Sequence, residues 1–291
     1  MAIIMNDDIT LNTDTPTTEK EQFEQSALHY HEFPRPGKIS VTPIKQLANQ
    51  RDLALAYSPG VAIPCLEIQR DPALAAKYTA RSNLVGVITN GTAVLGLGNI
   101  GPLASKPVME GKGVLFKKFA GIDVFDIEIA QNDPDKFIEA VASLEPTFGG
   151  INLEDIKAPE CFKIERELRE RMNIPVFHDD QHGTSIIVAA AMLNALLITG
   201  KKIEEIKVVC SGAGAAAISC LDIICALGVD KNNIFVSDSR GIITTSRENL
   251  DETKQRYARN TTATTIEEVM DDVDMFLGLS MPGTLTEDMV R

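Results

Sequence analysis

Two acidic pairs in this chain each follow an apolar run of the length expected of a buried strand. Glu154 and Asp155 come after residues 147–153, and Asp179 and Asp180 come after residues 174–177. Carboxylates gathered at strand ends of an α/β protein are costly unless a positive charge lies between them. Their oxygens are the ligands that Mg²⁺ and Mn²⁺ prefer. The pattern therefore predicts a divalent-cation site and an enzyme that handles an anionic substrate.

Two further side chains are candidates for proton transfer. Lys112 lies between glycines in Glu-Gly-Lys-Gly, and a lysine held near a metal can have its pKa lowered enough to act as a base. A solvated lysine is the alternative. Tyr57 precedes a Pro-Gly turn, where it is either a buried tyrosine with a satisfied hydroxyl or a proton donor. For His178 and His182, which flank the second acidic pair, we expect structural roles.

A glycine motif points to a dinucleotide. Residues 211–217 read Ser-Gly-Ala-Gly-Ala-Ala-Ala after a strand-like run and before a helical pattern. Gly212, Gly214 and Ala217 match G-x-G-x-x-G/A, in which the glycines allow a tight turn and a close approach to a pyrophosphate at a helix N-terminus. Asp238 ends the next predicted strand, where an acidic residue would meet the adenine ribose. A ligand-free β-turn-α connection is the alternative.

The apolar periodicity supplies the elements that must position these residues. An Asn-Gly pair inside residues 84–97 indicates a β-hairpin, and the second glycine motif at 96–101 closes it. That motif either brings backbone amides to a substrate carboxylate or is a structural turn. The predicted helices cover residues 107–119, 134–144, 159–172, 183–199, 214–227 and 265–272. The predicted strands cover residues 122–129, 174–177, 206–211, 234–237 and 274–279.

These elements predict an α/β fold with two domains. Residues 1–25 are polar and without periodicity, which is typical of a mobile tail. Residues 26–180 would form an α/β domain that holds the substrate and the metal. Residues 181–291 would form a doubly wound, Rossmann-type nucleotide domain.

The composition limits the class of protein further. A net charge of −13 and a pI of about 4.8 argue against nucleic acid and anionic membranes as partners. Five scattered cysteines without a Cys-x-x-Cys pair favour reduced thiols in the cytoplasm. We expect no secretion signal and no apolar run long enough to span a bilayer.

Six motifs in order give the chain a family resemblance. They are Ala-Tyr-Ser-Pro-Gly-Val (56–61), Val-Leu-Gly-Leu-Gly-Asn-Ile-Gly (94–101), Val-Met-Glu-Gly-Lys-Gly (108–113), Asn-Leu-Glu-Asp (152–155), Phe-His-Asp-Asp-Gln-His-Gly-Thr (177–184) and Gly-Ala-Gly-Ala-Ala-Ala (212–217). From about Ser26 to the last residue, the chain resembles malic enzyme, of the bacterial NADP-dependent type whose malic domain is usually fused to a phosphate-acetyltransferase-like domain.

The resemblance implies a role for each candidate residue. Tyr57 would be the general acid and Lys112 the general base, with Asp179 as the charged neighbour of the lysine. The metal, Mg²⁺ or Mn²⁺, would be held by three carboxylates, those of Glu154, Asp155 and Asp180. The dinucleotide would contact the glycine loop and the acidic residue after the next strand, namely Gly212, Ala213, Gly214, Ala215, Ala216 and Asp238.

The reaction that the resemblance implies is oxidative decarboxylation of L-malate to pyruvate and CO₂. Asp238 would repel a 2′-phosphate and favour NAD, whereas Arg240 could bind that phosphate, and the fused bacterial relatives favour NADP. The alternatives are a malolactic or oxaloacetate-decarboxylating enzyme, or a fragment that binds without turnover. The resemblance also implies a homodimer or a higher homo-oligomer, and in a dimer the N-terminal region would reach across to the partner.

Two departures from the family pattern affect these expectations. Ala93 stands where animal malic enzymes carry an arginine that holds the substrate carboxylate, so Lys106 or backbone amides near Gly98 would have to replace it. The family pattern also continues past the position of Arg291, with an Asn-Pro segment that contacts substrate and nicotinamide. We therefore interpret the nucleotide domain as incomplete in this chain.

Overall fold

The computed structural model describes residues 18–291, which fall into a short unit ending at Thr42 and a large unit beginning at Pro43. The short unit holds helix α1 (Glu19–Glu32), which begins with a capping box between Thr18 and Glu21. Of the predicted tail, residues 1–17 lie outside the described residues. Residues 19–25 are helical, contrary to the prediction, because the Thr-x-x-Glu cap satisfies the first amides of the helix.

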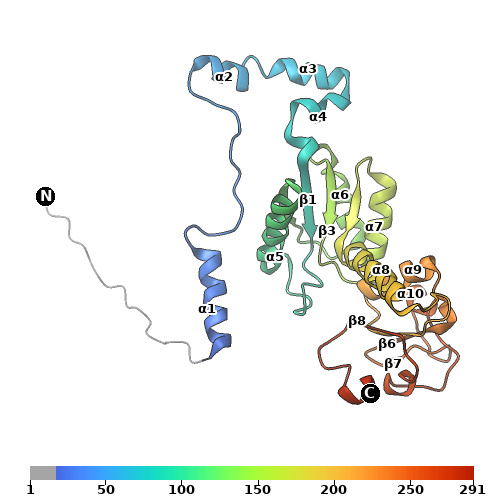
Figure 1. The fold of residues 1–291 in the computed structure, drawn as a ribbon. Helices are drawn as coiled ribbons and strands as arrows, with labels where there is room; N and C mark the ends of the chain where they lie inside the picture. Colours follow the sequence, from blue (N-terminus) through green and yellow to red (C-terminus); the bar gives the residue numbers. More distant parts are fainter. Residues whose placement is uncertain (1–17) are drawn as a thin grey trace. The chain divides into compact units, whose positions relative to one another are not determined.

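The first sheet of the large unit is fully parallel, in the order β2-β1-β3-β4. Its strands are β1 (Leu84–Thr89), β2 (Asp123–Glu128), β3 (Gly150–Leu153) and β4 (Val176–His178). Helix α5 (Pro102–Leu115) covers one face, and α6 (Pro134–Ala142) and α7 (Glu160–Arg171) cover the other (Figure 1). Leu153 pairs with His178, so the two acidic pairs leave the sheet at the same edge.

The second sheet has the order β7-β6-β5-β8, with β7 antiparallel to the rest. Its elements are β5 (Val208–Ser211), α9 (Ala215–Leu227), β6 (Ile234–Asp238), β7 (Gly241–Ile242) and β8 (Met275–Gly278). Buried residues of α9, β5 and β6 form its core. The predicted α/β class with parallel sheets is thus confirmed. The predicted boundary near residue 180 falls in the first turn of α8 (Asp179–Thr199), which follows the first sheet and packs on α9.

The remaining helices are short. They are α2 (Gln50–Ala56), α3 (Ala62–Arg70), α4 (Ala75–Tyr78), α10 (Glu252–Gln255) and α11 (Glu287–Val290). Neither α2 nor α3 buries any residue, and both expose large apolar side chains, among them Leu55 and Ile63. The helix predicted over 265–272 is reduced to a single 3-10 turn, Glu267–Val269.

The predicted hairpin at residues 84–97 is wrong. Strand β1 pairs in parallel with β2 and β3, and residues 90–101 form a loop with one isolated bridge between Val94 and Gly98. The loop is closed where the Gly101 amide donates to the Gly91 carbonyl (3.0 Å). Gly91 has a φ of +67°, and a Cβ there would lie 2.2 Å from the Gly101 oxygen. The Asn-Gly pair does mark a turn, but β1 is central in a parallel sheet and has no antiparallel neighbour.

Helix α8 begins one turn before the predicted start at Gly183. Asp179 and Asp180 therefore occupy its first turn, where the helix dipole favours negative charge. A Cβ at Gly183 would lie 3.0 Å from the Asp179 carboxylate, so glycine leaves room for this side chain. Helix α5 also begins earlier than predicted, at Pro102, and it contains Pro107.

By length and composition alone, α8 could cross a membrane, contrary to the expectation that no segment is long enough. One such helix is weak evidence, and α8 carries carboxylates in its first turn and packs on α9. Its outer face exposes a row of large apolar side chains, Ile186, Ile187, Leu193, Leu197 and Ile198. A contiguous exposed apolar face of this kind is typical of a surface that binds another protein.

Candidate functional site

Lys112 of α5 meets two carboxylates at the carboxyl edge of the first sheet. Its Nζ lies 2.8 Å from Asp179 Oδ2 and 3.2 Å from Glu154 Oε1. Burial by itself would lower the pKa of Lys112, but the charges of Glu154 and Asp179 outweigh burial and the pKa is raised. In this arrangement the lysine is protonated, so the lowered pKa expected of a base would require another cation to take over the carboxylates.

The carboxylates around Lys112 form a compact acidic cluster. Oxygen atoms of Glu154, Asp179 and Asp180 lie within 4.8 Å of one another. The expected metal ligands were Glu154, Asp155 and Asp180, so Asp179 takes the place of Asp155 in this group. Asp155 is adjacent: its amide donates to Asp180 Oδ2 (3.2 Å), and its own Oδ2 is buried without a hydrogen-bond partner. Four carboxylates face one ammonium group, a donor set that suits Mg²⁺ or Mn²⁺.

The pKa values of the cluster record this excess of negative charge. Burial raises the pKa of Glu154 to about 8 against the opposing charge of Lys112, and Asp179 and Asp180 add to the rise. Burial and the neighbouring Asp180 raise the pKa of Asp155 to about 6. Burial also raises the pKa of Asp180. A bound cation would relieve this repulsion.

The loop after β1 holds the turn that carries Asp155. The Ala93 amide donates to the Asp155 carbonyl (3.0 Å), and the Thr92 hydroxyl accepts the Lys157 amide (3.0 Å). Asp155 itself has a φ of +54°, which is uncommon for a residue other than glycine. Ala93, at the position of the family's arginine, therefore contributes a backbone contact to the site.

Lys106, one of the two proposed replacements for the arginine, is paired with two carboxylates. Its Nζ lies 2.5 Å from Asp126 and 3.4 Å from Glu128, both on β2. These two carboxylates offset the charge of Lys106, and the space around Gly98, the other alternative, is open. The choice between Lys106 and the backbone amides near Gly98 stays a prediction.

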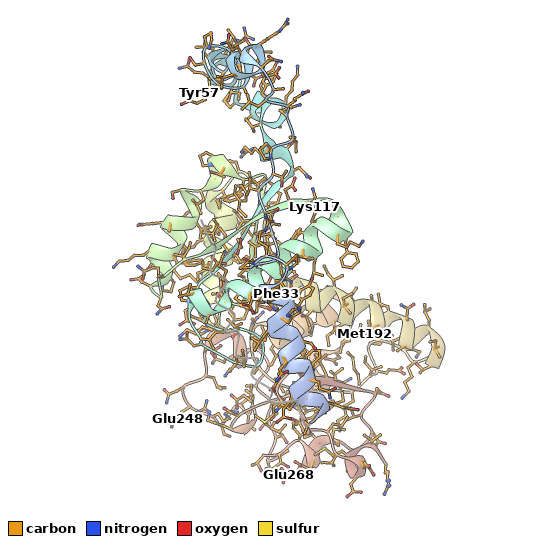
Figure 2. The ribbon with its side chains drawn as sticks, turned by 90° about the vertical axis from the view of Figure 1, so that its left-hand side faces the viewer. Phe33, Tyr57, Lys117, Met192, Glu248 and Glu268 are labelled. Atoms are coloured by element: carbon orange, nitrogen blue, oxygen red, sulfur yellow. The ribbon has the colours of Figure 1, made fainter. Side chains whose placement is uncertain are left out.

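The structure does not bring Tyr57 to the acidic cluster. Tyr57 follows α2 as its C-cap and is 72% exposed (Figure 2). Among the described residues, the ion pairs of Lys112 go to Glu154 and Asp179. His178 is fully buried, and burial lowers its pKa to about 4. His182 Nε2 lies 2.5 Å from Glu165 on α7. Lys112 and the carboxylates thus come together within one chain, whereas Tyr57 does not join them.

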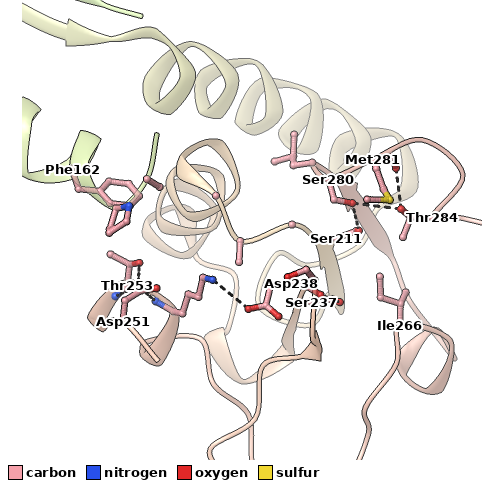
Figure 3. A pocket seen from close by; sticks show the side chains of 18 residues that line it. Phe162, Ser211, Ser237, Asp238, Asp251, Thr253, Ile266, Ser280, Met281 and Thr284 are labelled. Carbon is pink, nitrogen blue, oxygen red and sulfur yellow. Dashed lines mark hydrogen bonds and ion pairs between the residues drawn. The ribbon is translucent and has the colours of Figure 1, made fainter. Parts of the chain in front are cut away.

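A cavity of about 630 Å³ opens at the carboxyl edge of the second sheet (Figure 3). The loop of residues 211–214 lines it, and Ala215 and Ala216 form the first turn of α9 behind the loop. Gly212 has a φ of +120°, and a Cβ there would lie 2.4 Å from the Leu279 carbonyl oxygen. Gly214 has open space around it, and Ala217 is buried in the core. The glycine motif thus leaves an unobstructed backbone loop at a helix N-terminus.

Asp238 lines the same cavity, but its carboxylate is engaged by two basic residues. Arg247 Nη2 lies 3.0 Å and 2.9 Å from its two oxygens, and Lys254 Nζ lies 3.3 Å away. Burial alone would raise the pKa of Asp238, but bonds from Arg247, the Arg240 amide and Lys254 outweigh it and lower the pKa to about 2. The sequence reasoning missed Arg247 and Lys254, because only their approach in space reveals this pairing.

Together, the two sites define a two-domain α/β protein with an acidic, lysine-containing site and a dinucleotide-type glycine loop. Residues 36–169 match the N-terminal domain of malic enzyme, and residues 181–291 match the NAD-binding domain of malic enzyme. The chain belongs to the malic enzyme family.

Relatives of known name or structure are similar over most of the chain. The NADP-dependent malic enzyme of Salmonella typhimurium is 68% identical over 93% of this chain, and the NAD-dependent malic enzyme of Rhizobium meliloti is 61% identical over 92%. The matches cover 36% and 35% of those proteins, so the chain spans about a third of their length. The structure of NAD-dependent malic enzyme from Thermotoga maritima is 44% identical, with a TM-score of 0.85, over 91% of this chain and 71% of that one.

The raised pKa of Glu154 predicts an unusual pH dependence of stability. The folded value is about 8 and the ordinary value 4.5, so the folded protein holds an extra proton between these limits. The stabilisation that protonated Glu154 gives the folded state is complete below pH 4.5 and is lost as the pH rises through 8. Without divalent cations, the free energy of unfolding should fall by on the order of 2 kcal/mol between pH 6 and 8.5. Urea titrations in a chelating buffer measure this, and an equal fall in Glu154→Gln would contradict the assignment.

Proposed function

We propose that this chain carries the catalytic site of an enzyme that converts L-malate to pyruvate and CO₂ and reduces NADP. The observation that carries the proposal is the position of Lys112, whose Nζ lies within 3.2 Å of two carboxylates in an acidic cluster. The names of the relatives support the same activity. A divalent cation held by Glu154, Asp180 and either Asp155 or Asp179 would supply Lewis-acid stabilisation of the developing oxyanion.

The residues of the chain perform the proton transfers. Lys112 Nζ would accept the proton of the C2 hydroxyl of malate, and a bound nicotinamide would supply the hydride acceptor for C2. The resulting β-keto acid would lose its C4 carboxylate as CO₂, and Tyr57 would donate a proton to C3 of the enolate to give pyruvate. Lys112 must first become neutral. A cation held by Glu154 would offset part of the negative charge that now raises the pKa of Lys112, and burial, which opposes that rise, would then favour the neutral amine.

Replacement of the proposed base tests this reaction. Lys112→Ala should lower kcat/KM for malate by about 10²–10⁴-fold, because a positioned proton acceptor is lost. The matched control is Lys117→Ala, at an exposed lysine just after α5. Production of NADPH and pyruvate with Mn²⁺ is the measurement. Unchanged turnover in Lys112→Ala would refute the role. Lactate without net NADPH would instead indicate the malolactic reaction. The bifunctional malic/malolactic enzyme of Bacillus subtilis, which is 49% identical, is the reason to test for it.

The charges around Asp238 favour NADP as the coenzyme. Arg247 binds both oxygens of the carboxylate, so Asp238 no longer repels a 2′-phosphate. Lys254 makes a longer contact at 3.3 Å and lines the cavity. We infer that Arg247 neutralises the acid and that Lys254 turns to the phosphate. The names of the relatives include both coenzymes, so this geometry is the stronger argument.

Lys254→Ala should raise KM for NADP by about 10-fold or more, the usual value of a charge-assisted hydrogen bond. The same variant should bind NAD nearly as well as the unaltered protein does, because NAD has no 2′-phosphate. Steady-state kinetics with each coenzyme measure the ratio of the two effects. Equal losses with NADP and NAD would show that Lys254 does not read the phosphate.

We further propose that the protein works as a cytoplasmic homodimer in which Tyr57 of one subunit completes the site around Lys112 of the other. Tyr57 is exposed and lies between α2 and α3, two helices that bury no residue within the chain. Helix α8, whose first turn carries Asp179 and Asp180, exposes an apolar face as well. A dimer interface over these helices would bury their apolar surface and would also bring Tyr57 to the Lys112 site of the other subunit. All five cysteines are free thiols, as expected in the cytoplasm.

A heterodimer tests the exchange of Tyr57. Tyr57→Phe and Lys112→Ala should each be nearly inactive alone. A heterodimer of the two, purified through different tags, should recover about half of the unaltered activity, because one of its two sites then has both intact residues. If Tyr57 serves its own chain, both sites remain defective and the heterodimer stays inactive.

A further inference from the structure

Asn152 is a buried polar residue inside an otherwise apolar strand. It lies on β3, in register with Val87 of β1 and Phe177 of β4, and is 2% exposed. The residues on either side of it, Ile151 and Leu153, belong to the hydrophobic core. A buried amide is costly unless its hydrogen bonds are made.

Among residues 18–291, the side chain of Asn152 makes one hydrogen bond, and it goes to Glu154. Its Nδ2 donates to Glu154 Oε2 at 2.8 Å, whereas Glu154 Oε1 lies 3.2 Å from Lys112 Nζ. The two oxygens of the carboxylate are thus divided, one toward the strand and one toward the lysine and the acidic cluster. When the Glu154 carboxyl is ionised, as it must be to hold a cation, its oxygens only accept, and the amide presents its NH₂ group to Oε2.

The other side of the amide has no such partner. Asn152 Oδ1 is buried and accepts no hydrogen bond among the described residues. Leaving a buried acceptor unpaired costs about 1–3 kcal/mol. An apolar side chain of similar size would fill this place without that cost, so packing does not explain an asparagine. The bond to Glu154 does.

We propose that Asn152 is a positioning residue that fixes Glu154 with Oε1 aimed at the cation site and at Lys112. Without Asn152, the Glu154 carboxylate is free to rotate about its last side-chain bond, and the oxygen that faces the cluster is no longer defined. This inference rests on the proposed cation site. It predicts that loss of the amide lowers the affinity of the site for the cation, even though Asn152 does not contact the cation.

The test measures binding of Mn²⁺ alone to the purified protein by electron paramagnetic resonance, which counts the free ion. Asn152→Leu should lower the affinity for Mn²⁺ by about 10–100-fold, the usual effect of losing a hydrogen bond to a metal ligand. The control is Asn83→Leu. Asn83 donates to the Gly121 carbonyl (3.0 Å) at the opposite end of the same sheet, and its loss should leave Mn²⁺ affinity unchanged.

A double-mutant cycle with Glu154→Gln separates positioning from general damage. If Asn152 acts through Glu154, adding Asn152→Leu to the Glu154→Gln variant should lower its Mn²⁺ affinity further by less than about 3-fold. That is a small part of the effect of Asn152→Leu in the unaltered protein. Equal losses in both backgrounds would overturn the proposal. If Asn152→Leu does not fold, Asn152→Ser, which is shorter and polar, takes its place in the cycle. Failure of the unaltered protein to bind Mn²⁺ would refute the proposed cation site, whereas binding that Asn152→Leu leaves intact would refute only the role of Asn152.

Discussion

Four carboxylates share the carboxyl edge of the first sheet with one ammonium group, that of Lys112. Burial, and after it the repulsion from neighbouring carboxylates, raises the pKa values of Glu154, Asp155 and Asp180 above the ordinary range. Such a cluster is unfavourable for folding, and a fold retains it where it serves a function. Every neighbouring element can be understood by how it holds this concentration of charge.

The parallel sheet brings the charges together, and the elements around it fix their directions. The register of Leu153 with His178 places the two acidic pairs at one edge. Helix α8 starts at Asp179, so its positive end faces the carboxylates. The closed loop of residues 90–101 supports the strained turn at Asp155 from the other side. The site therefore depends on strand ends and a helix start, which are rigid elements.

Much of this arrangement could be predicted from the sequence. The apolar runs before each acidic pair correctly indicated two strands with a common edge, and the glycine motif correctly indicated a strand, a tight turn and a helix. The hairpin failed because Asn90-Gly91 specifies a turn but not the direction of the next strand. The start of α1 was not predicted, because a capping box in a polar segment carries no apolar periodicity.

The parts of the site that escaped prediction depend on tertiary contacts. The pairing of Asp238 with Arg247 and Lys254 brings together residues nine and sixteen positions apart, and no local pattern encodes it. The separation of Tyr57 from Lys112 is equally invisible in the sequence, because a motif specifies residue types and not how far one motif lies from another in space. Asn152 lies within one of the six family motifs, but only its hydrogen bond to Glu154 suggests a role for it.

The most direct test of the central claim is a crystal structure of the protein soaked with Mn²⁺, with anomalous scattering used to locate the ion. The account predicts one strong anomalous peak among the carboxylates of Glu154, Asp180 and a third aspartate, on the side that faces Lys112. Mn²⁺ bound elsewhere, with these carboxylates still grouped around the lysine and no ion between them, would contradict it.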